Sequence, residues 1–133
     1  MKNCNLKVFS SYFTICIILL CSLYSDAYGS KRRHHESYYQ ERWCERSKGQ
    51  QEFVLPDRTR ADCITDTLVV EVDFANKAWS EGIGQVLYYS LVTDKQAMLV
   101  IICEDPKDLK YIDRIINIIS YYDLDILIEV VRP

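Results

Sequence analysis

The chain has 133 residues, of which 49% are hydrophobic and 26% are charged, and its formal net charge is −3. This length allows one core of ordinary size, and the acidic balance excludes a protein that binds polyanions over its whole surface. The charge is uneven, however, because residues 30–61 carry eight Lys/Arg and five Asp/Glu, whereas residues 62–133 carry six and thirteen. A local basic face in the first part is compatible with this pattern.

Residues 1–29 predict a cleavable signal peptide. Lys2 and Lys7 precede an apolar run at 13–21, and small residues close the segment. This order of basic start, short apolar core and small-residue boundary is typical of secretory signals. The run is shorter than the roughly 20 residues of a spanning helix, so we expect no stable membrane span after cleavage. A retained anchor is the alternative, and in either case the single remaining domain, residues 30–133, is secreted or periplasmic.

Three cysteines follow the predicted signal peptide, namely Cys44, Cys63 and Cys103. An oxidising compartment permits a disulfide, and three cysteines allow at most one pair within a chain. The sequence does not select the pair. Burial as small apolar residues is an equal alternative for all three.

Hydrophobic spacing predicts three helices and five strands. Apolar residues four apart, such as Tyr39 and Trp43, indicate helices, whereas alternating or continuous apolar runs indicate strands. The expected elements are a helix at 36–47, strands at 51–55, 58–64 and 68–74, a helix at 76–91, a strand at 98–103, a helix at 109–122 and a strand at 126–131. Their order, αβββαβαβ, predicts an α/β fold in which helices flank a mixed sheet. We expect an antiparallel meander from the first three strands and burial of the last two, and we interpret Gly82 and Gly84 as points where another backbone comes close.

Acidic side chains gather on the strand at 68–74. Alternation places Glu71 and Asp73 on one face, about 7 Å apart, and the apolar residues on the other. Asp62, on the preceding strand, can point to the same side, and Lys77 follows at the start of the next helix. Three converging carboxylates would suit Mg²⁺ or Mn²⁺. The alternative is that these acids line the solvated face of a half-covered sheet.

The placement of these residues resembles the PD-(D/E)XK nuclease superfamily, which has the restriction-endonuclease-like fold with an αβββαβ core. The resemblance rests on Glu41 on the first helix, Asp62 on the second strand, Glu71-Val72-Asp73 on the third strand, and the helix with Gly84-Gln85-x-x-Tyr88. It covers most of residues 30–133, and within the superfamily it points to a group of small bacterial and phage proteins.

The resemblance implies a role for each acidic residue. Asp62 and Glu71 would hold a divalent metal, with Asp73 beside them, and Glu41 would contribute through a second metal or a water. Such a metal lowers the pKa of a bound water and offsets charge that develops on a scissile phosphate.

Two further roles follow from the same resemblance. Gln85 would orient the substrate backbone or the carboxylate on the third strand. The lysine of the family normally stands two residues after the glutamate, where this chain has Asp73. Lys77 would therefore have to steady the attacking hydroxide in its place.

Two functions remain open on the sequence alone. The first is an exported, metal-dependent nuclease whose basic residues face the phosphate backbone of nucleic acid; these residues are Arg42, Arg46, Lys48, Arg58 and Arg60. The second is a binding or assembly domain in the cell envelope that keeps the fold without catalysis, for which pairs of adjacent tyrosines would supply an interface. The sequence does not choose between DNA and RNA, and it does not set the oligomeric state.

Overall fold

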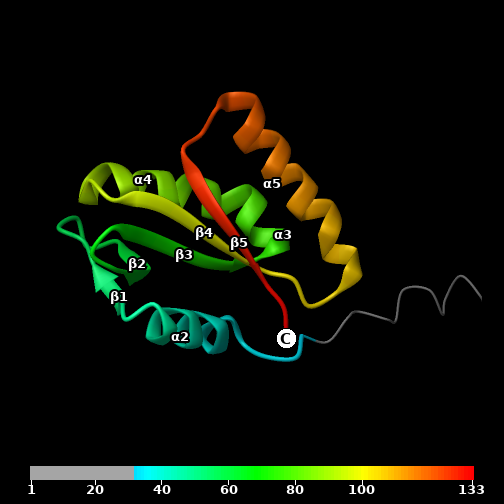
Figure 1. The fold of residues 1–133 in the computed structure, drawn as a ribbon, viewed down its shortest axis with the longest axis horizontal. Coiled ribbons are helices and arrows are strands. Elements are labelled where there is room, and N and C mark those ends of the chain that lie inside the picture. The colour runs from blue at the N-terminus through cyan, green and yellow to red at the C-terminus, as the bar shows by residue number, and fades with distance from the viewer. Residues whose placement is uncertain (1–31) are drawn as a thin grey trace, which may run out of the picture. The chain divides into compact units, whose positions relative to one another are not determined.

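Five strands form one sheet, and helices pack on both of its faces (Figure 1). The computed structural model describes residues 32–133, so the predicted signal peptide lies outside the described residues. The elements are, in chain order, α2 (Glu36–Arg46), β1 (Gln50–Val54), β2 (Arg60–Ile64), β3 (Leu68–Phe74), α3 (Ala75–Lys77), the π-helical turn η1 (Ala78–Gly82), α4 (Ile83–Thr93), β4 (Gln96–Ile102), the 3-10 turn η2 (Pro106–Asp108), α5 (Leu109–Tyr122) and β5 (Ile126–Val131). The predicted α/β class, with helices flanking a mixed sheet, is confirmed.

The strand order in the sheet follows the chain, β1-β2-β3-β4-β5. The strands β1, β2 and β3 form the predicted antiparallel meander, whereas β3, β4 and β5 are parallel neighbours. Parallel neighbours need a crossover connection, which α4 and α5 provide. Because successive crossovers of one hand return to the same side, both helices pack on one face of the sheet.

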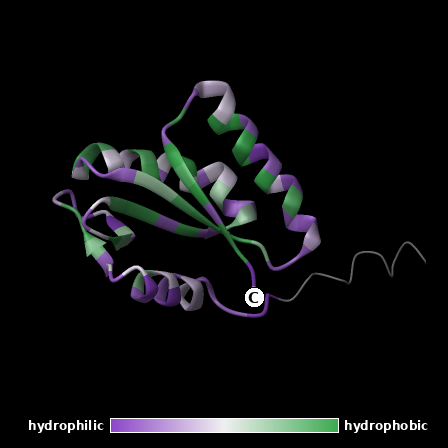
Figure 2. Cartoon of the chain, in the orientation of Figure 1, coloured by the Kyte–Doolittle hydropathy of each residue, from purple (hydrophilic) through white to green (hydrophobic). Residues whose placement is uncertain are grey.

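The helix α2 covers the opposite face. Tyr39 and Trp43 of α2 pack against Val70, Val72 and Phe74 of β3. Figure 2 shows the resulting pattern, in which β3 and β4 are largely hydrophobic and α2 is largely hydrophilic. The sheet therefore lies between two cores, and side chains of β3 alternate between them. Within residues 32–133, no helix combines the length and the apolar character needed to cross a membrane.

The two parallel strands after the meander differ in burial. The prediction of a covered strand is confirmed for β4, where Leu99 to Ile102 are buried. It is wrong for β5, which is an edge strand with only Ile126 buried. A short apolar run has the same appearance in a central strand and in an edge strand, so the sequence could not distinguish them.

The two glycines before and within α4 also differ. A Cβ on Gly82 would lie 3.0 Å from Leu99 Cδ1 and 3.4 Å from Asp73 Oδ2, so this residue is in close contact with side chains of the sheet. The neighbour is a side chain and not the backbone that we expected. At Gly84 the prediction is wrong, because no atom lies within 4 Å of such a Cβ.

A disulfide between Cys44 and Cys63 joins α2 to β2, with their Cα atoms 5.7 Å apart. Both residues are fully buried, and Cys103 is buried as a free thiol. Gly49 follows α2 and lies against the bridge, because a Cβ there would collide with both sulphur atoms. A glycine at position 49 is thus required by the space that the disulfide occupies.

Replacement of both Cys44 and Cys63 by alanine should lower the free energy of unfolding by about 3 kcal/mol, since the bridge restricts the unfolded chain and its loss opens a buried site. Urea denaturation followed by circular dichroism measures the change. Cys103→Ala is the control, because it removes a buried thiol without removing a crosslink. An unchanged midpoint in the double variant would contradict this role.

Candidate functional site: a buried carboxyl cluster

Three carboxyl groups on adjacent strands, Asp62, Glu71 and Asp73, form what we call the carboxyl cluster. Glu71 and Asp73 lie on the face of β3 that α4 covers, and they are only 7% and 4% exposed. The register aligns Glu71 with Leu99 of β4, so an apolar core residue lies beside it. The alternative that these acids line a solvated face is therefore wrong. Ionised carboxylates are costly at such depth without a compensating partner.

Asp62 joins the cluster because the ladder between β2 and β3 is interrupted beside it. The paired residues of this ladder are Cys63 with Val70 and Ile64 with Val69. At the next position the side chain of Asp62 replaces the backbone as acceptor, since Val72 N donates to Asp62 Oδ2 at 2.8 Å. Continuation of the same register would place Asp62 directly opposite Glu71, so their side chains point to the same face.

Glu52 lies on the other side of Asp62. In the register of β1 and β2 it falls between the pairs Gln51–Cys63 and Phe53–Ala61, opposite Asp62, and its φ of 51° is left-handed. Such a backbone is unusual for a residue with a side chain inside a strand and costs about 1 kcal/mol or more. The structure thus concentrates local strain beside the carboxyl cluster.

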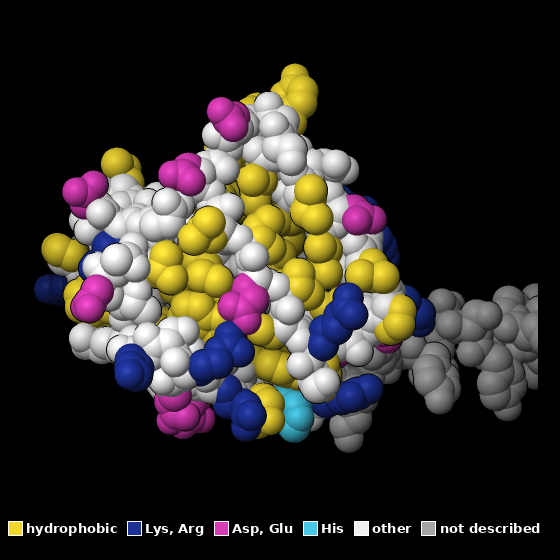
Figure 3. All heavy atoms as spheres, viewed as in Figure 1, with side chains coloured by type: hydrophobic (Ala, Val, Ile, Leu, Met, Phe, Trp, Pro, Cys, Tyr) yellow, Lys and Arg dark blue, Asp and Glu magenta, His cyan; other side chains and the backbone are white. Residues whose placement is uncertain are grey.

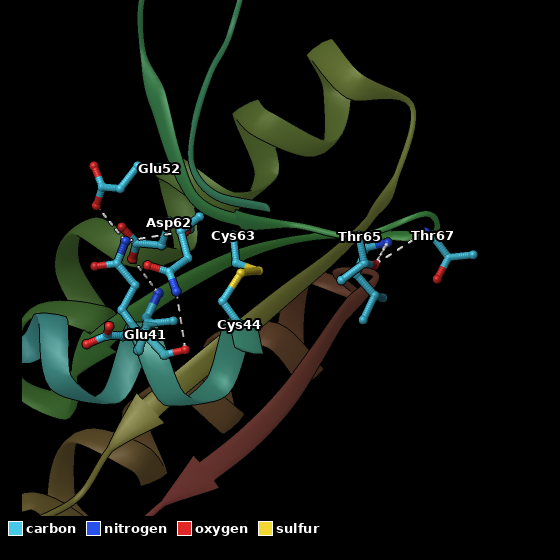
Figure 4. The surroundings of a disulfide bond; sticks show 11 residues. Glu41, Cys44, Glu52, Asp62, Cys63, Thr65 and Thr67 are labelled. Carbon is cyan, nitrogen blue, oxygen red and sulfur yellow. Dashed lines mark hydrogen bonds between the residues drawn. A yellow bond between two sulfur atoms is a disulfide. The ribbon is translucent and has the colours of Figure 1, made fainter. Parts of the chain in front are cut away.

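Two polar side chains hold Glu52 in this position, and Figure 4 shows Glu52 near Asp62 on the neighbouring strand. Gln40 of α2 donates from Nε2 to Glu52 Oε1 at 2.6 Å and to the Asp62 carbonyl at 3.2 Å. Arg60 forms an ion pair with Glu52 at 2.5 Å. Gln40 lies one helical turn before Cys44, so the disulfide and these hydrogen bonds fasten the same side of α2 to β2.

The acidic residue of α2 that reaches the carboxyl cluster is Glu36. It hydrogen-bonds Asp73 and accepts from Lys77 Nζ at 3.3 Å. Glu41, which we expected in this role, is exposed, and its backbone carbonyl accepts from Gln51 at 3.5 Å. The sequence contained a usable signal, because Glu36, Gln40 and Cys44 are spaced four apart and form one stripe of the helix.

The side chain of Lys77 extends toward the cluster. Its ammonium lies 3.9 Å from Asp73 Oδ1 as well as 3.3 Å from Glu36, and the side chain is half exposed. These two acids raise the pKa of Lys77, with Glu36 as the larger cause. The lysine is therefore a fixed positive charge at the rim of the carboxyl cluster.

The electrostatics of the cluster favour its protonated forms. Burial, together with the charges of Asp62 and Asp73, raises the pKa of Glu71 to about 9. Burial and the hydrogen bond with Glu36 raise the pKa of Asp73 to about 8. For Asp62, burial raises the pKa to about 6, although the hydrogen bond from Val72 opposes the shift. Without a cation, this group of acids is thus partly neutral near pH 7.

The π-helical turn η1 and the helix α4 close the cluster from above the sheet. Gly82 at the end of η1 allows Asp73 to approach, and Tyr89 of α4 is buried near Glu71, whose charge contributes to the raised pKa of the tyrosine after burial. Gln85 is exposed and hydrogen-bonds Tyr89. Tyr88, which the sequence analysis singled out, turns outward and donates to Asp57. Tyr89 is hence the tyrosine of this helix that lies beside the carboxyl groups.

One oxygen in the cluster has no hydrogen-bond partner. Among the described residues, Glu71 Oε2 is the one buried side-chain oxygen that accepts no hydrogen bond. Buried polar atoms are nearly always paired in native proteins, so each exception asks for an explanation. Among residues 32–133, no three or more His, Cys, Asp or Glu side chains are arranged so that they could together hold a metal ion. Any cation would therefore rest on fewer protein ligands.

The basic residues of the first part are distributed over several surfaces. Arg46 pairs with Glu129 of β5 at 2.6 Å, and the Arg42 guanidinium lies 5.3 Å from the Tyr38 ring centre. Both line a groove of about 520 Å³ between α2 and the end of β5, together with Arg132. Arg60 is held by Glu52 beside the carboxyl cluster. Arg42 and Arg46 thus share one groove, whereas Arg60 lies apart from them.

Comparison with family models, with curated proteins and with solved structures finds no match to this chain.

The raised carboxyl pKa values predict a loss of stability as the pH rises. The folded chain binds more protons than the unfolded chain between the ordinary carboxyl pKa near 4 and the folded value of about 9 for Glu71, so unfolding becomes easier across this window. The melting temperature, measured without divalent cations, should fall from pH 5 to pH 9. Glu71→Gln should flatten this dependence and stabilise the protein at pH 9 by about 1 to 2 kcal/mol.

The matched control is Glu41→Gln, an exposed change of the same type, which should keep the wild-type slope. A Glu71→Gln variant with the slope of the wild type would show that Glu71 ionises normally in the folded chain.

Proposed function

We propose that this chain is a nuclease-like protein that hydrolyses phosphodiester bonds of nucleic acid with the help of Mg²⁺ or Mn²⁺. The observation that carries the proposal is the convergence of Asp62 and Glu71 from two neighbouring strands, with one buried oxygen of Glu71 left without a partner. Like-charged groups in a buried site are usually retained for a purpose other than stability. A divalent cation would relieve their repulsion.

Two carboxylates are enough for the expected ion. Mg²⁺ commonly uses one or two protein carboxylates and completes its coordination with waters and substrate phosphates. Asp62 and Glu71 fit this set, and Glu71 Oε2 has no hydrogen bond to lose on binding. When bound, the ion would activate a water and stabilise charge on the phosphate.

Each of the remaining polar residues has a defined task in this proposal. Glu36 takes the position on the first helix that we expected for Glu41, and it orients Asp73 and Lys77. Lys77 supplies a positive charge at the rim, where it can orient an attacking water or a phosphate oxygen. Gln85, which is exposed and hydrogen-bonds Tyr89, would contact the substrate backbone. Asp73 stays protonated or paired with Lys77 and does not serve as a necessary ligand.

The alternative is a non-catalytic binding domain with the same fold. Its support is that Asp73 stands where the superfamily has lysine and that Lys77 is already paired with Glu36 and Asp73. A lysine held by two acids is less available to a hydroxide. Assays of metal binding and of nucleic-acid cleavage distinguish the two functions.

Glu36→Gln should weaken Mn²⁺ binding about 10- to 100-fold, because it removes a negative charge beside the cluster that balances the positive charge of Lys77. Isothermal titration calorimetry with Mn²⁺ alone measures the affinity. Glu41→Gln, the same change five residues later on the exposed side of α2, should bind Mn²⁺ as the wild type does. Equal losses of Mn²⁺ affinity in both variants would show that Glu36 has no specific role in the site.

Supercoiled plasmid incubated with the protein should be nicked in the presence of Mg²⁺ or Mn²⁺ and left intact with EDTA. Asp62→Asn and Glu71→Gln should each abolish nicking, whereas Glu41→Gln should retain it, because the first two remove the oxygens that hold the ion. Metal binding without nicking of plasmid or cleavage of single-stranded DNA and RNA would favour the binding domain. If the protein bound neither metal, both the proposed metal site and the proposed nuclease activity would be wrong.

A further inference from the structure

The open side of β5 is a surface that the carboxyl cluster does not use. As the last strand of the sheet, β5 pairs only with β4 among residues 32–133. The Val131 carbonyl accepts from Cys103 N at 3.0 Å, so Val131 faces β4. Because residues of a strand alternate in direction, Ile128 and Val130 direct their backbone N–H and C=O groups outward. This edge therefore offers a short ladder of unpaired donors and acceptors.

Apolar side chains border this ladder on both faces of the sheet. Leu127 is 48% exposed on the α2 side, and Val130 is 37% exposed on the α5 side. On α5, Ile116 is 46% exposed and lies two turns after Leu109, which lines a pocket with Arg132 at the end of β5. Figure 3 shows hydrophobic side chains gathered over β5 and along the neighbouring flank of α5. We call this surface the β5 edge.

The one acidic side chain within β5 is already neutralised inside the molecule. Glu129 accepts from Trp43 Nε1 at 2.9 Å and from Arg46 at 2.6 Å. The carboxylate within β5 is thus already paired and would repel an identical surface less than a free one. Natural edge strands are usually protected by charge, bulges or coverage, and such protection is weak here.

The other edge of the sheet is protected. In β1, the left-handed Glu52 interrupts the regular ladder, and its neighbours Gln50 and Gln51 are polar. A pairing of β5 with β1 of another copy would continue head to tail and form filaments, whereas pairing of β5 with β5 closes after two chains. The difference between the two edges therefore selects the closed arrangement.

We propose that the β5 edge pairs antiparallel with the β5 edge of a second copy of this chain, which joins two five-stranded sheets into one. A two-fold axis at Ile128 aligns Ile128 with its own copy and Ile126 with Val130, and it keeps the two Glu129 side chains apart. The same axis brings α5 beside its copy, where Ile116 loses its exposure to water. The carboxyl cluster lies between β2 and β3, so this pairing leaves its surroundings unchanged in both chains.

The test compares substitutions on the two edges. The full chain is expressed and purified, its N-terminus is determined by mass spectrometry, and its molar mass is measured by light scattering and sedimentation over a wide concentration range. The wild type is expected to have twice the mass of the processed chain. Leu127→Lys with Val130→Lys should give a monomer. Val54→Lys on β1 with Leu91→Lys on α4, two highly exposed positions elsewhere, should stay dimeric.

Two further measurements keep the test decisive. Circular dichroism and the melting temperature show whether the lysine variant is folded, and if it is not, Ile116→Lys on the helical flank replaces it as a milder change with the same expected monomer. Hydrogen exchange should show protected amides at Ile128 and Val130 in the dimer and faster exchange on dilution. A monomeric wild type at every concentration, open-ended filaments, or fast exchange of these amides in a dimer would overturn the proposal.

Discussion

The rest of the structure is arranged around two buried carboxyl groups, Glu71 and Asp73, and the partly buried Asp62, where two strands separate. Asp62, Glu71 and Asp73 repel one another when ionised, and burial adds to this cost. The surrounding features limit the cost, because Val72 N donates to Asp62 and Lys77 balances the charge near Asp73. A fold selected for stability alone would place apolar residues here. The cluster therefore constrains α2, η1 and β2 together.

The sequence predicted the elements well because their periodicity is local. The apolar residues of β3 and α5 repeat with the period of a strand and of a helix, and the structure follows both. The edge position of β5, the pairing of Cys44 with Cys63 and the part taken by Glu36 depend on which distant segments meet. No single segment contains that information.

In the candidate site, too, the sequence predicted the local pattern but not the contacts between distant segments. Alternation along β3 was sufficient to place Glu71 and Asp73 on one face, but it could not show that α4 covers that face or that Tyr89 lies beside Glu71. Gly49 gives a similar lesson, since a glycine after a helix usually signals a left-handed residue, whereas here it leaves room for two sulphur atoms. The need for a glycine at this position therefore arises from the tertiary packing.

The π-helical turn η1 gives the segment between β3 and α4 one residue more per turn than a regular helix would hold. The length of η1 determines how α4 is rotated about its own axis relative to the sheet. Deletion of a single residue from Ala78–Gly82 would allow regular α-helical pairing and would rotate α4 by about 100° about its axis. Tyr89 would then leave the carboxyl cluster, and the apolar stripe of α4 would no longer face the sheet. The extra residue is accordingly a spacer that the helix cannot lose without losing its orientation.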